Sequence, residues 1–412
     1  MTGGTGRPRD GGLAALVGRR RLLALGAGAV GGTAIAAATG STRLLMNGGP
    51  AERALSAAYP GKTEMIVQRV RAPLLETPMA VFDEGVFTPN DRFFVRWHWE
   101  VPAEVDTTAF RLTVDGAVQR PVAFSLAELL AMPRVEVAAV NQCAGNSRAL
   151  FEPRVSGAQW SHGAMGNARW EGVPLRTLLD RAGVKAGATA VRFSGLDQPL
   201  TDADDYAKSI PVDVARSDLP FVAFAMNGEQ LPVLNGFPLR LVIPGWYSTY
   251  WVKALDRIEV LDRPDENFWT AKAYRVPTGP RPGVTPGTTE FDSRPISTMP
   301  PRSFITNIAN GQRLPAAERA VVRGIAMGGA SGVSMVELSA DNGRSWQPAR
   351  LGPDEGRYGF RRFEAALSLP RGPVTLLSRC TNMDRVVQPM DAIWNPSGYA
   401  RGSVEAVHAM VA

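Results

Sequence analysis

Hydrophobic and polar residues alternate over short stretches in much of the chain, and this period of two predicts β-strands. Two stretches follow a helical period instead, at 126–132 and at 174–183, and the second ends at Gly183. Helices are too few to alternate regularly with the strands, so the pattern predicts an α+β domain with mixed strand order. The strands are predicted at 93–101, 110–118, 135–142, 190–195, 220–228 and 237–245.

The last third of the chain has a different pattern. Residues 276–302 are rich in proline, glycine and threonine, which is typical of an extended linker. Beyond it, short alternating segments are separated by turn residues at even spacing, as in an immunoglobulin-like β-sandwich. We therefore place an α+β domain at 85–275 and a sandwich at 290–412, and assign no regular domain to 41–90.

Composition excludes several classes of protein. Nine tryptophans and sixteen phenylalanines among 412 residues supply enough apolar surface to exclude a disordered chain. The net charge is +6, but residues 1–40 carry +4 of it, from five arginines and Asp10. The rest of the chain has no basic run interleaved with aromatic residues, so we expect no nucleic-acid partner.

The first 40 residues have the pattern of an export signal. Arg19–Arg21 precede an uncharged, weakly apolar stretch from Leu22 to Thr42 that contains the small residues Ala36–Ala38. An arginine pair before such a stretch resembles a twin-arginine leader, which exports proteins already folded around a cofactor, and it predicts a periplasmic location. A membrane anchor is the alternative, and the many glycines with few large aliphatic residues make it the poorer interpretation.

Cysteine and histidine are scarce. Two cysteines and three histidines exclude a disulfide scaffold and a zinc ribbon, and no C-x-x-C-H motif is present to attach a c-type haem. We interpret Cys380, His162 and His408 as structural residues.

Cys143 lies in NQCAGNSR (141–148), directly after a predicted strand. Three interpretations stand: a buried free thiol, a nucleophile with His98 or His162 as its base, and a thiolate ligand of a soft metal. The polar neighbours of Cys143, together with Arg148, favour the thiolate and hence the reactive interpretations.

Arg96 and His98 are two residues apart on a predicted strand and therefore share a face. A cation beside an imidazole is typical of an anion-binding site. The alternative is that Trp97 and Trp99 form the buried face and that the polar pair is simply solvated.

Eight motifs follow one another along the chain: FFVRWH (93–98), NQCAGNSR (141–148), GAMGNARWEGVPL (163–175), MNGEQLP (226–232), NGFPLRLVIPG (235–245), WVK (251–253), FW with YR (268–275) and WNPSGY (394–399). In this order they resemble the sulfite oxidase family of molybdopterin enzymes, from about residue 85 to the end of the chain. The resemblance makes the domain at 85–275 a molybdopterin-binding catalytic domain. With a predicted export signal and no haem motif, the chain resembles the bacterial periplasmic sulfite dehydrogenases of that family.

The resemblance implies a role for each matching residue. Cys143 is the protein ligand to molybdenum, and Asn235 stands where animal members carry a histidine that contacts the cofactor. The other implied cofactor-binding residues are Phe94, Val95, Arg96, Trp97, His98, Asp197, Arg240, Trp251, Val252 and Lys253. The implied substrate-pocket residues are Arg96, Arg148, Trp160, Tyr274 and Arg401, although the sequence pattern by itself reads Tyr274 as a surface aromatic beside the linker.

By this resemblance we expect oxidation of sulfite to sulfate, with one molybdenum–molybdopterin per chain and no haem in this chain. Electrons would pass to a cytochrome c or a haem subunit, and the C-terminal domain would support a homodimer. Two alternatives remain. One is a related molybdopterin reductase that acts on oxidised methionine or a similar substrate, and the other is a non-catalytic exported binding protein.

The export interpretation predicts that changing Arg19, Arg20 and Arg21 to lysine strands the protein in the cytoplasm with its cofactor bound. Cell fractionation with molybdenum analysis of each fraction measures this. Unchanged periplasmic accumulation would point to the general secretory route instead.

Overall fold

The computed structural model describes residues 43–44, 53–56, 59, 61–199, 202–279, 281–316 and 319–412. The predicted export signal at 1–40 lies outside these ranges. Within them, residues 44–412 form one compact unit. No helix of the described ranges combines the length and the apolar character needed to cross a membrane.

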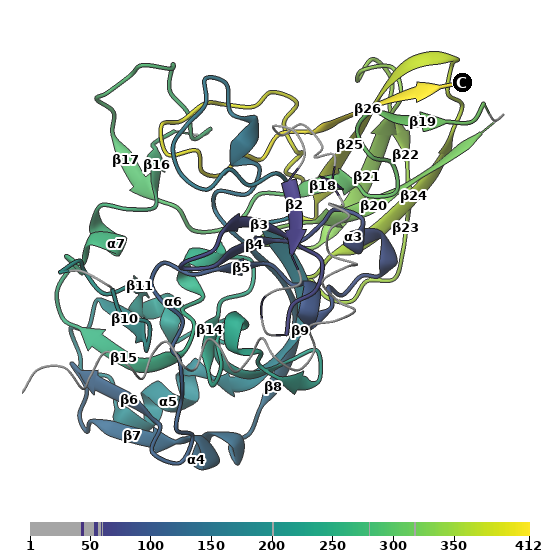
Figure 1. Cartoon of the computed structure of the whole chain (residues 1–412). Coiled ribbons are helices and arrows are strands. Elements are labelled where there is room, and N and C mark those ends of the chain that lie inside the picture. The colour runs from purple at the N-terminus through teal and green to yellow at the C-terminus, as the bar shows by residue number, and fades with distance from the viewer. Residues whose placement is uncertain are drawn as a thin grey trace, which may run out of the picture. The chain divides into compact units, whose positions relative to one another are not determined.

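One antiparallel sheet has the order β13-β12-β9-β8, with β14 paired to β12. Its strands β8, β9 and β14 are labelled in Figure 1. The pairing of β8 with β9 runs from Val135 opposite Gly172 to Gln142 opposite Met165, so β8 is fixed along its whole length. Its last residues are buried on both faces, and Cys143 follows at once. The strands are β8 (Val135–Gln142), β9 (Met165–Pro174), β12 (Phe221–Met226), β13 (Glu229–Gln230) and β14 (Arg240–Val242).

A second sheet is mixed, in the order β11-β10-β15-β6-β7. The pair of β15 and β6 is parallel, and the other neighbours are antiparallel. The strands are β6 (Arg111–Gly116), β7 (Val122–Ser125), β10 (Ala190–Gly195), β11 (Ala207–Pro211) and β15 (Leu255–Leu261).

Regular structure also precedes residue 85, which the sequence analysis left unassigned. The strands β2, β3, β4 and β5 are neighbours in that order, and β5 pairs with β4 through two residues. The prediction of a strand over 93–101 is therefore too long, because β4 offers only three residues to pair with. The strands are β1 (Arg43–Leu44), β2 (Arg53–Ser56), β3 (Met65–Arg69), β4 (Leu74–Glu76) and β5 (Val95–Arg96).

Both predicted helices are present. In α4, Ser125 and Glu128 form a capping box, and α5 ends at Gly183, whose φ of 70° is the left-handed conformation that favours glycine. The α-helices are α3 (Val81–Glu84), α4 (Leu126–Leu130), α5 (Leu175–Ala182), α6 (Val212–Ala215) and α7 (Phe268–Ala271). The 3₁₀ helices are η1 (Asn90–Arg92), η2 (Arg148–Leu150), η3 (Val233–Asn235) and η4 (Ser248–Tyr250).

The C-terminal part is a β-sandwich with its own buried core. One sheet has the order β18-β20-β24-β23 and the other β19-β26-β25-β21-β22, and the predicted linker contains the hairpin β16–β17. Cys380 lies on β25 in this core, as expected. The strands are β16 (Arg275–Pro277), β17 (Ser293–Pro295), β18 (Arg302–Ile305), β19 (Gln312–Leu314), β20 (Ala320–Met327), β21 (Val333–Ser339), β22 (Gln347–Pro348), β23 (Arg350–Leu351), β24 (Arg361–Leu367), β25 (Gly372–Asn382) and β26 (Ala406–Val411).

Candidate active site

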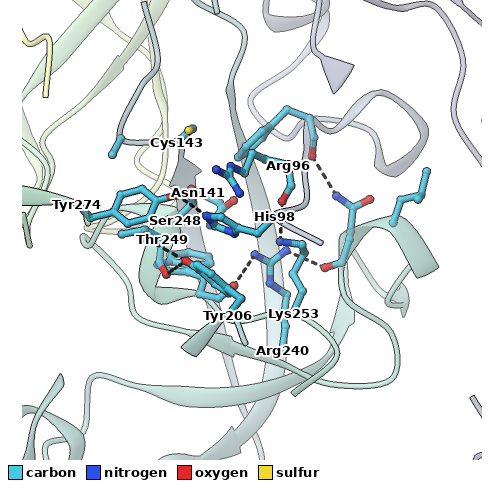
Figure 2. A pocket seen from close by; sticks show the side chains of 15 residues that line it. Arg96, His98, Asn141, Cys143, Tyr206, Arg240, Ser248, Thr249, Lys253 and Tyr274 are labelled. Carbon is cyan, nitrogen blue, oxygen red and sulfur yellow. Dashed lines mark hydrogen bonds between the residues drawn. The ribbon is translucent and has the colours of Figure 1, made fainter. Parts of the chain in front are cut away.

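A pocket forms where the ends of several elements meet, and Figure 2 shows the side chains in its wall. Cys143 reaches it from the end of β8, Arg96 from β5 and Arg240 from the start of β14. Sequence-predicted residues in the wall are Phe94, Arg96, His98, Cys143, Asn235, Arg240, Trp251, Lys253 and Tyr274. Residues in the wall that the sequence analysis missed are Asn141, Ala144, Tyr206, Leu234, Ser248 and Thr249.

Arg96, His98 and Tyr274 converge on one side of the pocket (Figure 2). The His98 Nε2 atom hydrogen-bonds the Tyr274 hydroxyl, and the His98 ring stacks on Tyr206 with centroids 3.6 Å apart. Tyr274 has a φ of 56° and is buried, so it is not the surface aromatic that the sequence pattern by itself indicates. Arg96 and His98 both face the pocket while Trp97 is buried, so the pair is not simply solvated.

Burial determines the protonation of this group. Burial, with Arg96 and Lys253 nearby, holds the pKa of His98 well below its usual range, so the imidazole is neutral. Burial raises the pKa of Tyr274 and keeps its phenol protonated, although Arg96 acts against this shift. Burial acts to lower the pKa of Arg96, but the pKa of this guanidinium is not lowered overall, so Arg96 stays charged.

The opposite side of the pocket contains Arg240, Lys253 and Asn235. The Arg240 guanidinium donates to the Asn235 carbonyl oxygen at 2.8 Å, and the Lys253 ammonium donates to the Arg96 carbonyl oxygen at 2.7 Å. Burial lowers the pKa of Arg240 to about 9, and burial followed by Arg240 lowers that of Lys253. Asp197 is buried outside the pocket wall, and burial raises its pKa against the influence of Lys253.

Lys62 fixes this side of the pocket from a segment that sequence analysis left unassigned. Its ammonium donates to the carbonyl oxygens of Asn90 and Phe93 at 2.6 and 2.8 Å, and to Asn235 Oδ1 at 2.7 Å. Asn235 Nδ2 in turn donates to the Phe94 carbonyl oxygen at 3.2 Å. Asn235 is therefore held in place by neighbours on three segments. No sequence motif marks Lys62, and only the fold brings it here.

Arg148 lies just behind the pocket wall. Its guanidinium donates to the Ala158 and Ser397 carbonyl oxygens at 3.2 Å each and lies 5.0 Å from the Tyr399 ring centroid. The Tyr399 ring stacks on Tyr274, so one aromatic ring separates Arg148 from the pocket residues. A Cβ atom at Gly145 would lie 2.6 Å from the guanidinium, so any larger residue there would displace the Arg148 side chain.

Five other predicted residues also lie outside the wall of the pocket. Trp160, Val95, Trp97 and Val252 are buried in the surrounding cores. Arg401 pairs with Glu405 and donates to the Leu150 carbonyl oxygen at 3.0 Å, and it does not line the pocket.

Comparison with known proteins identifies what this chain is similar to. The model of the oxidoreductase molybdopterin binding domain matches residues 98–269, and that of the Mo-co oxidoreductase dimerisation domain matches 293–404. The chain is 35% identical to chicken sulfite oxidase over 339 residues, which cover 78% of this chain and 73% of that protein. The chain belongs to the sulfite oxidase family. The matched ranges fall within the catalytic and sandwich domains predicted from the sequence, whose boundaries remain predictions.

Two further relatives agree with this assignment. Human mitochondrial sulfite oxidase is 35% identical over 355 residues, and the match covers 82% of this chain but only 64% of the human protein. The solved structure of the sulfane dehydrogenase SoxCD from Paracoccus pantotrophus has a TM-score of 0.71 and 26% identity, covering 84% of this chain and 87% of that one. Family membership confirms the predicted fold class and the molybdopterin-binding domain.

The pocket residues fit the family's cofactor. Arg96, Arg240 and Lys253 line the described wall without any carboxylate, which suits a phosphorylated anionic group. Within the pocket wall, three buried donors, Arg96 Nη1, Asn141 Nδ2 and Arg240 Nε, have no hydrogen-bond partner among the described residues. Such donors are costly unless a ligand satisfies them, and the Cys143 thiol suits a soft metal.

Buried lysines make stability depend on pH in the cofactor-free protein. Burial lowers the pKa of Lys62, and also of Lys208, to about 7 from the usual 10.5. Between these values only the unfolded chain holds the proton, so unfolding takes up protons and stability rises with pH. Below about pH 7 both states are protonated, and this contribution no longer changes.

We predict that Lys62→Met lowers the slope of unfolding free energy against pH, between pH 7.5 and 9, by at most about 1.4 kcal/mol per pH unit. Denaturant titrations of cofactor-free protein measure the slope. Lys272→Met, at an exposed lysine, is the matched control and should leave the slope unchanged. Equal slopes in all three proteins would contradict a buried, weakly basic Lys62.

Proposed function

We propose that the chain oxidises sulfite to sulfate at the Cys143 pocket, with one molybdenum–molybdopterin per chain and no haem of its own. The observation that carries the proposal is a buried thiol in a pocket whose described wall holds three cations and no carboxylate. Family membership supplies the cofactor class, and the sulfite oxidase relatives supply the substrate. Sulfite is a small oxyanion, which a carboxylate-free cationic pocket favours.

When bound, the cofactor supplies the two-electron chemistry and the oxygen that sulfite gains. The residues of this chain would hold it: Cys143 through its sulfur, and Arg240, Lys253 and Asn235 at the opposite side of the pocket. Arg240 and Lys253 are fixed by main-chain carbonyl oxygens, so they are already positioned before an anion arrives.

Arg96 binds and orients the substrate. Its buried Nη1 has no partner among the described residues and can donate a charge-assisted hydrogen bond to an oxyanion. Arg148 lies behind Tyr399, outside the pocket wall. Its positive charge attracts the anion over a distance rather than through a direct contact. Two guanidinium groups near the pocket therefore favour sulfite over a neutral sulfoxide.

Tyr274 and His98 hold a proton at the pocket. A protonated phenol and a neutral imidazole form one hydrogen bond, and in the tautomer with a hydrogen on Nε2 the His98 ring donates to the Tyr274 oxygen, which leaves the phenol hydrogen free. The tyrosine hydroxyl can thus donate to an oxygen of the substrate while His98 orients it.

We further propose a periplasmic location, a homodimer through the C-terminal domain, and a cytochrome c or haem subunit as the electron acceptor. The leader pattern supports the first and the match to a dimerisation domain the second. The third follows from the chemistry, because the two electrons taken from sulfite must leave to an external acceptor. A reductase acting on oxidised methionine is the weaker alternative, because a neutral substrate would gain little from arginines that bind an oxyanion.

Sulfite-dependent reduction of ferricyanide and of cytochrome c by purified, molybdenum-loaded protein tests the proposal. We expect turnover with sulfite, and slower or no turnover with thiosulfate or methionine sulfoxide under matching redox conditions. Fully loaded protein that turns over thiosulfate but not sulfite would favour a sulfane substrate, as in the name of SoxCD, and would overturn the proposal.

Cys143→Ser should leave a folded protein without sulfite oxidation, because a hard hydroxyl replaces the soft thiolate at the metal. Activity assays alongside circular dichroism measure this. Cys380→Ala is the matched control at a thiol buried in the sandwich, and it should retain kcat with a modest loss of thermal stability. Wild-type activity in Cys143→Ser would remove the central residue of the proposal.

Arg96→Gln should raise KM for sulfite by about ten- to a hundredfold, the effect of one lost charge-assisted contact to an anion. Arg148→Gln should raise KM by a smaller factor, because its charge acts through an intervening ring. Steady-state kinetics at fixed molybdenum content measure both. A larger KM effect for Arg148→Gln than for Arg96→Gln would show that Arg148 moves into the pocket when substrate binds.

A further inference from the structure

The segment from Cys143 to Phe151 is held by residues near the C-terminus. The Ala400 amide donates to the Ala144 carbonyl oxygen at 2.9 Å. Arg148 donates in the other direction, to the Ser397 carbonyl oxygen. The loop that carries both the metal-binding thiol and a substrate arginine is therefore tied to the region that follows β25.

Three charged residues extend this attachment. Arg302 on β18 donates from Nη2 to Ser147 Oγ at 3.0 Å and to Glu405 Oε1 at 3.3 Å. Arg401 donates to both carboxylate oxygens of Glu405, at 2.9 and 3.1 Å, and from Nη1 to the Leu150 carbonyl oxygen at 3.0 Å. We call Arg302, Glu405 and Arg401 the clamp, because its two arginines contact the loop three residues apart.

The clamp is deeply buried, and for this reason a gain in stability is not the best explanation for its presence. The side chain of Arg302 is 0% exposed, that of Glu405 9% and that of Arg401 12%. Two atoms of Arg302, Nε and Nη1, have no hydrogen-bond partner within the described ranges. Desolvating such charges costs about as much as their attraction returns, so an ion cluster of this kind is better suited to fixing one geometry.

Ser147 is the point that the clamp fixes. Its φ of 68° is left-handed, which is unusual for serine, so the loop needs external support there. Because Ser147 Oγ accepts from Arg302, its own hydroxyl hydrogen is free to donate to His162 Nδ1, 2.8 Å away. Burial lowers the pKa of His162 to about 4, so the ring stays neutral and able to accept. Ser147 is thus held from both sides.

We infer that the clamp is a positioning device. Through it, the sandwich fixes the conformation of the loop that carries Cys143 and Arg148. The members of the clamp do not touch the pocket. They act through Ser147 and Leu150 on the main chain between the thiol and the end of η2. The C-terminal domain then completes the active site in each chain, beyond any role in dimerisation. The kinetic part of the inference rests on the proposed function, and the structural part does not.

Glu405→Gln in the full-length, molybdenum-loaded protein tests the inference. It weakens the attraction of both arginines to residue 405 while it keeps the shape of the side chain. We expect amide hydrogen exchange over residues 144–151 to accelerate by about tenfold or more, because the loop opens locally. We also expect KM for sulfite to rise about fivefold with a smaller change in kcat, since Arg148 loses its position.

Asp83→Asn is the matched control. Asp83 on α3 pairs with Arg323 on β20 at 2.6 Å, so it also links the sandwich to the preceding part of the chain, but it does not contact the loop. This variant should lose thermal stability without a change in loop exchange or KM. Arg302→Lys should restore much of the loop protection that Arg302→Met loses, because an ammonium can still donate to Ser147.

The outcomes separate the two proposals. If Glu405→Gln loses thermal stability as Asp83→Asn does, with unchanged exchange over 144–151 and unchanged KM, the clamp is only structural and the inference is wrong. If wild-type protein does not oxidise sulfite at all, the proposed function fails, and exchange over 144–151 still decides whether the clamp positions the loop.

Discussion

The rest of the structure depends on an unbalanced charge: Arg96, Arg240 and Lys253 converge on one pocket with no carboxylate in its described wall. Burial lowers the pKa of Arg240 and Lys253, so these charges are costly at the pocket unless an anion pairs with them. An anionic cofactor and an anionic substrate remove that penalty. Pairing with an anionic ligand therefore makes the electrostatics of this pocket more favourable.

The sheets set where these cations lie. Cys143 follows a strand that is paired along its whole length, so the thiol is at a fixed point at the edge of the sheet. Arg240 begins a strand paired to β12, and Arg96 ends a two-residue strand paired to β4. Rigid strands thus position the thiol and the arginines of the pocket. Irregular segments, such as the one that contains Lys62, hold the pocket wall from outside. A site built in this way is preorganised before substrate binds.

The sequence was informative where a local pattern determines structure. The strands at 135–142 and 190–195 were predicted with the bounds that the structure shows, and the helix before Gly183 ends where expected. Most pocket residues came from motifs that resemble a family. The strand β9 was recognised only as a motif, because its buried residues do not alternate along the whole run.

What could not be predicted depends on contacts between distant segments. Lys62 meets Asn235 across 173 positions, and Arg302 meets Ser147 across 155. No local pattern specifies such pairs. Arg401 was placed in the substrate pocket by the resemblance, yet in the structure a carboxylate four residues later holds its guanidinium.

The central claim is that Cys143 joins the protein to the metal. X-ray absorption at the molybdenum edge of the loaded protein tests it most directly, because it counts sulfur ligands without relying on turnover. The account predicts one more sulfur ligand in the wild type than in Cys143→Ser, with the cofactor's own sulfurs unchanged. The same sulfur count in both proteins would contradict it.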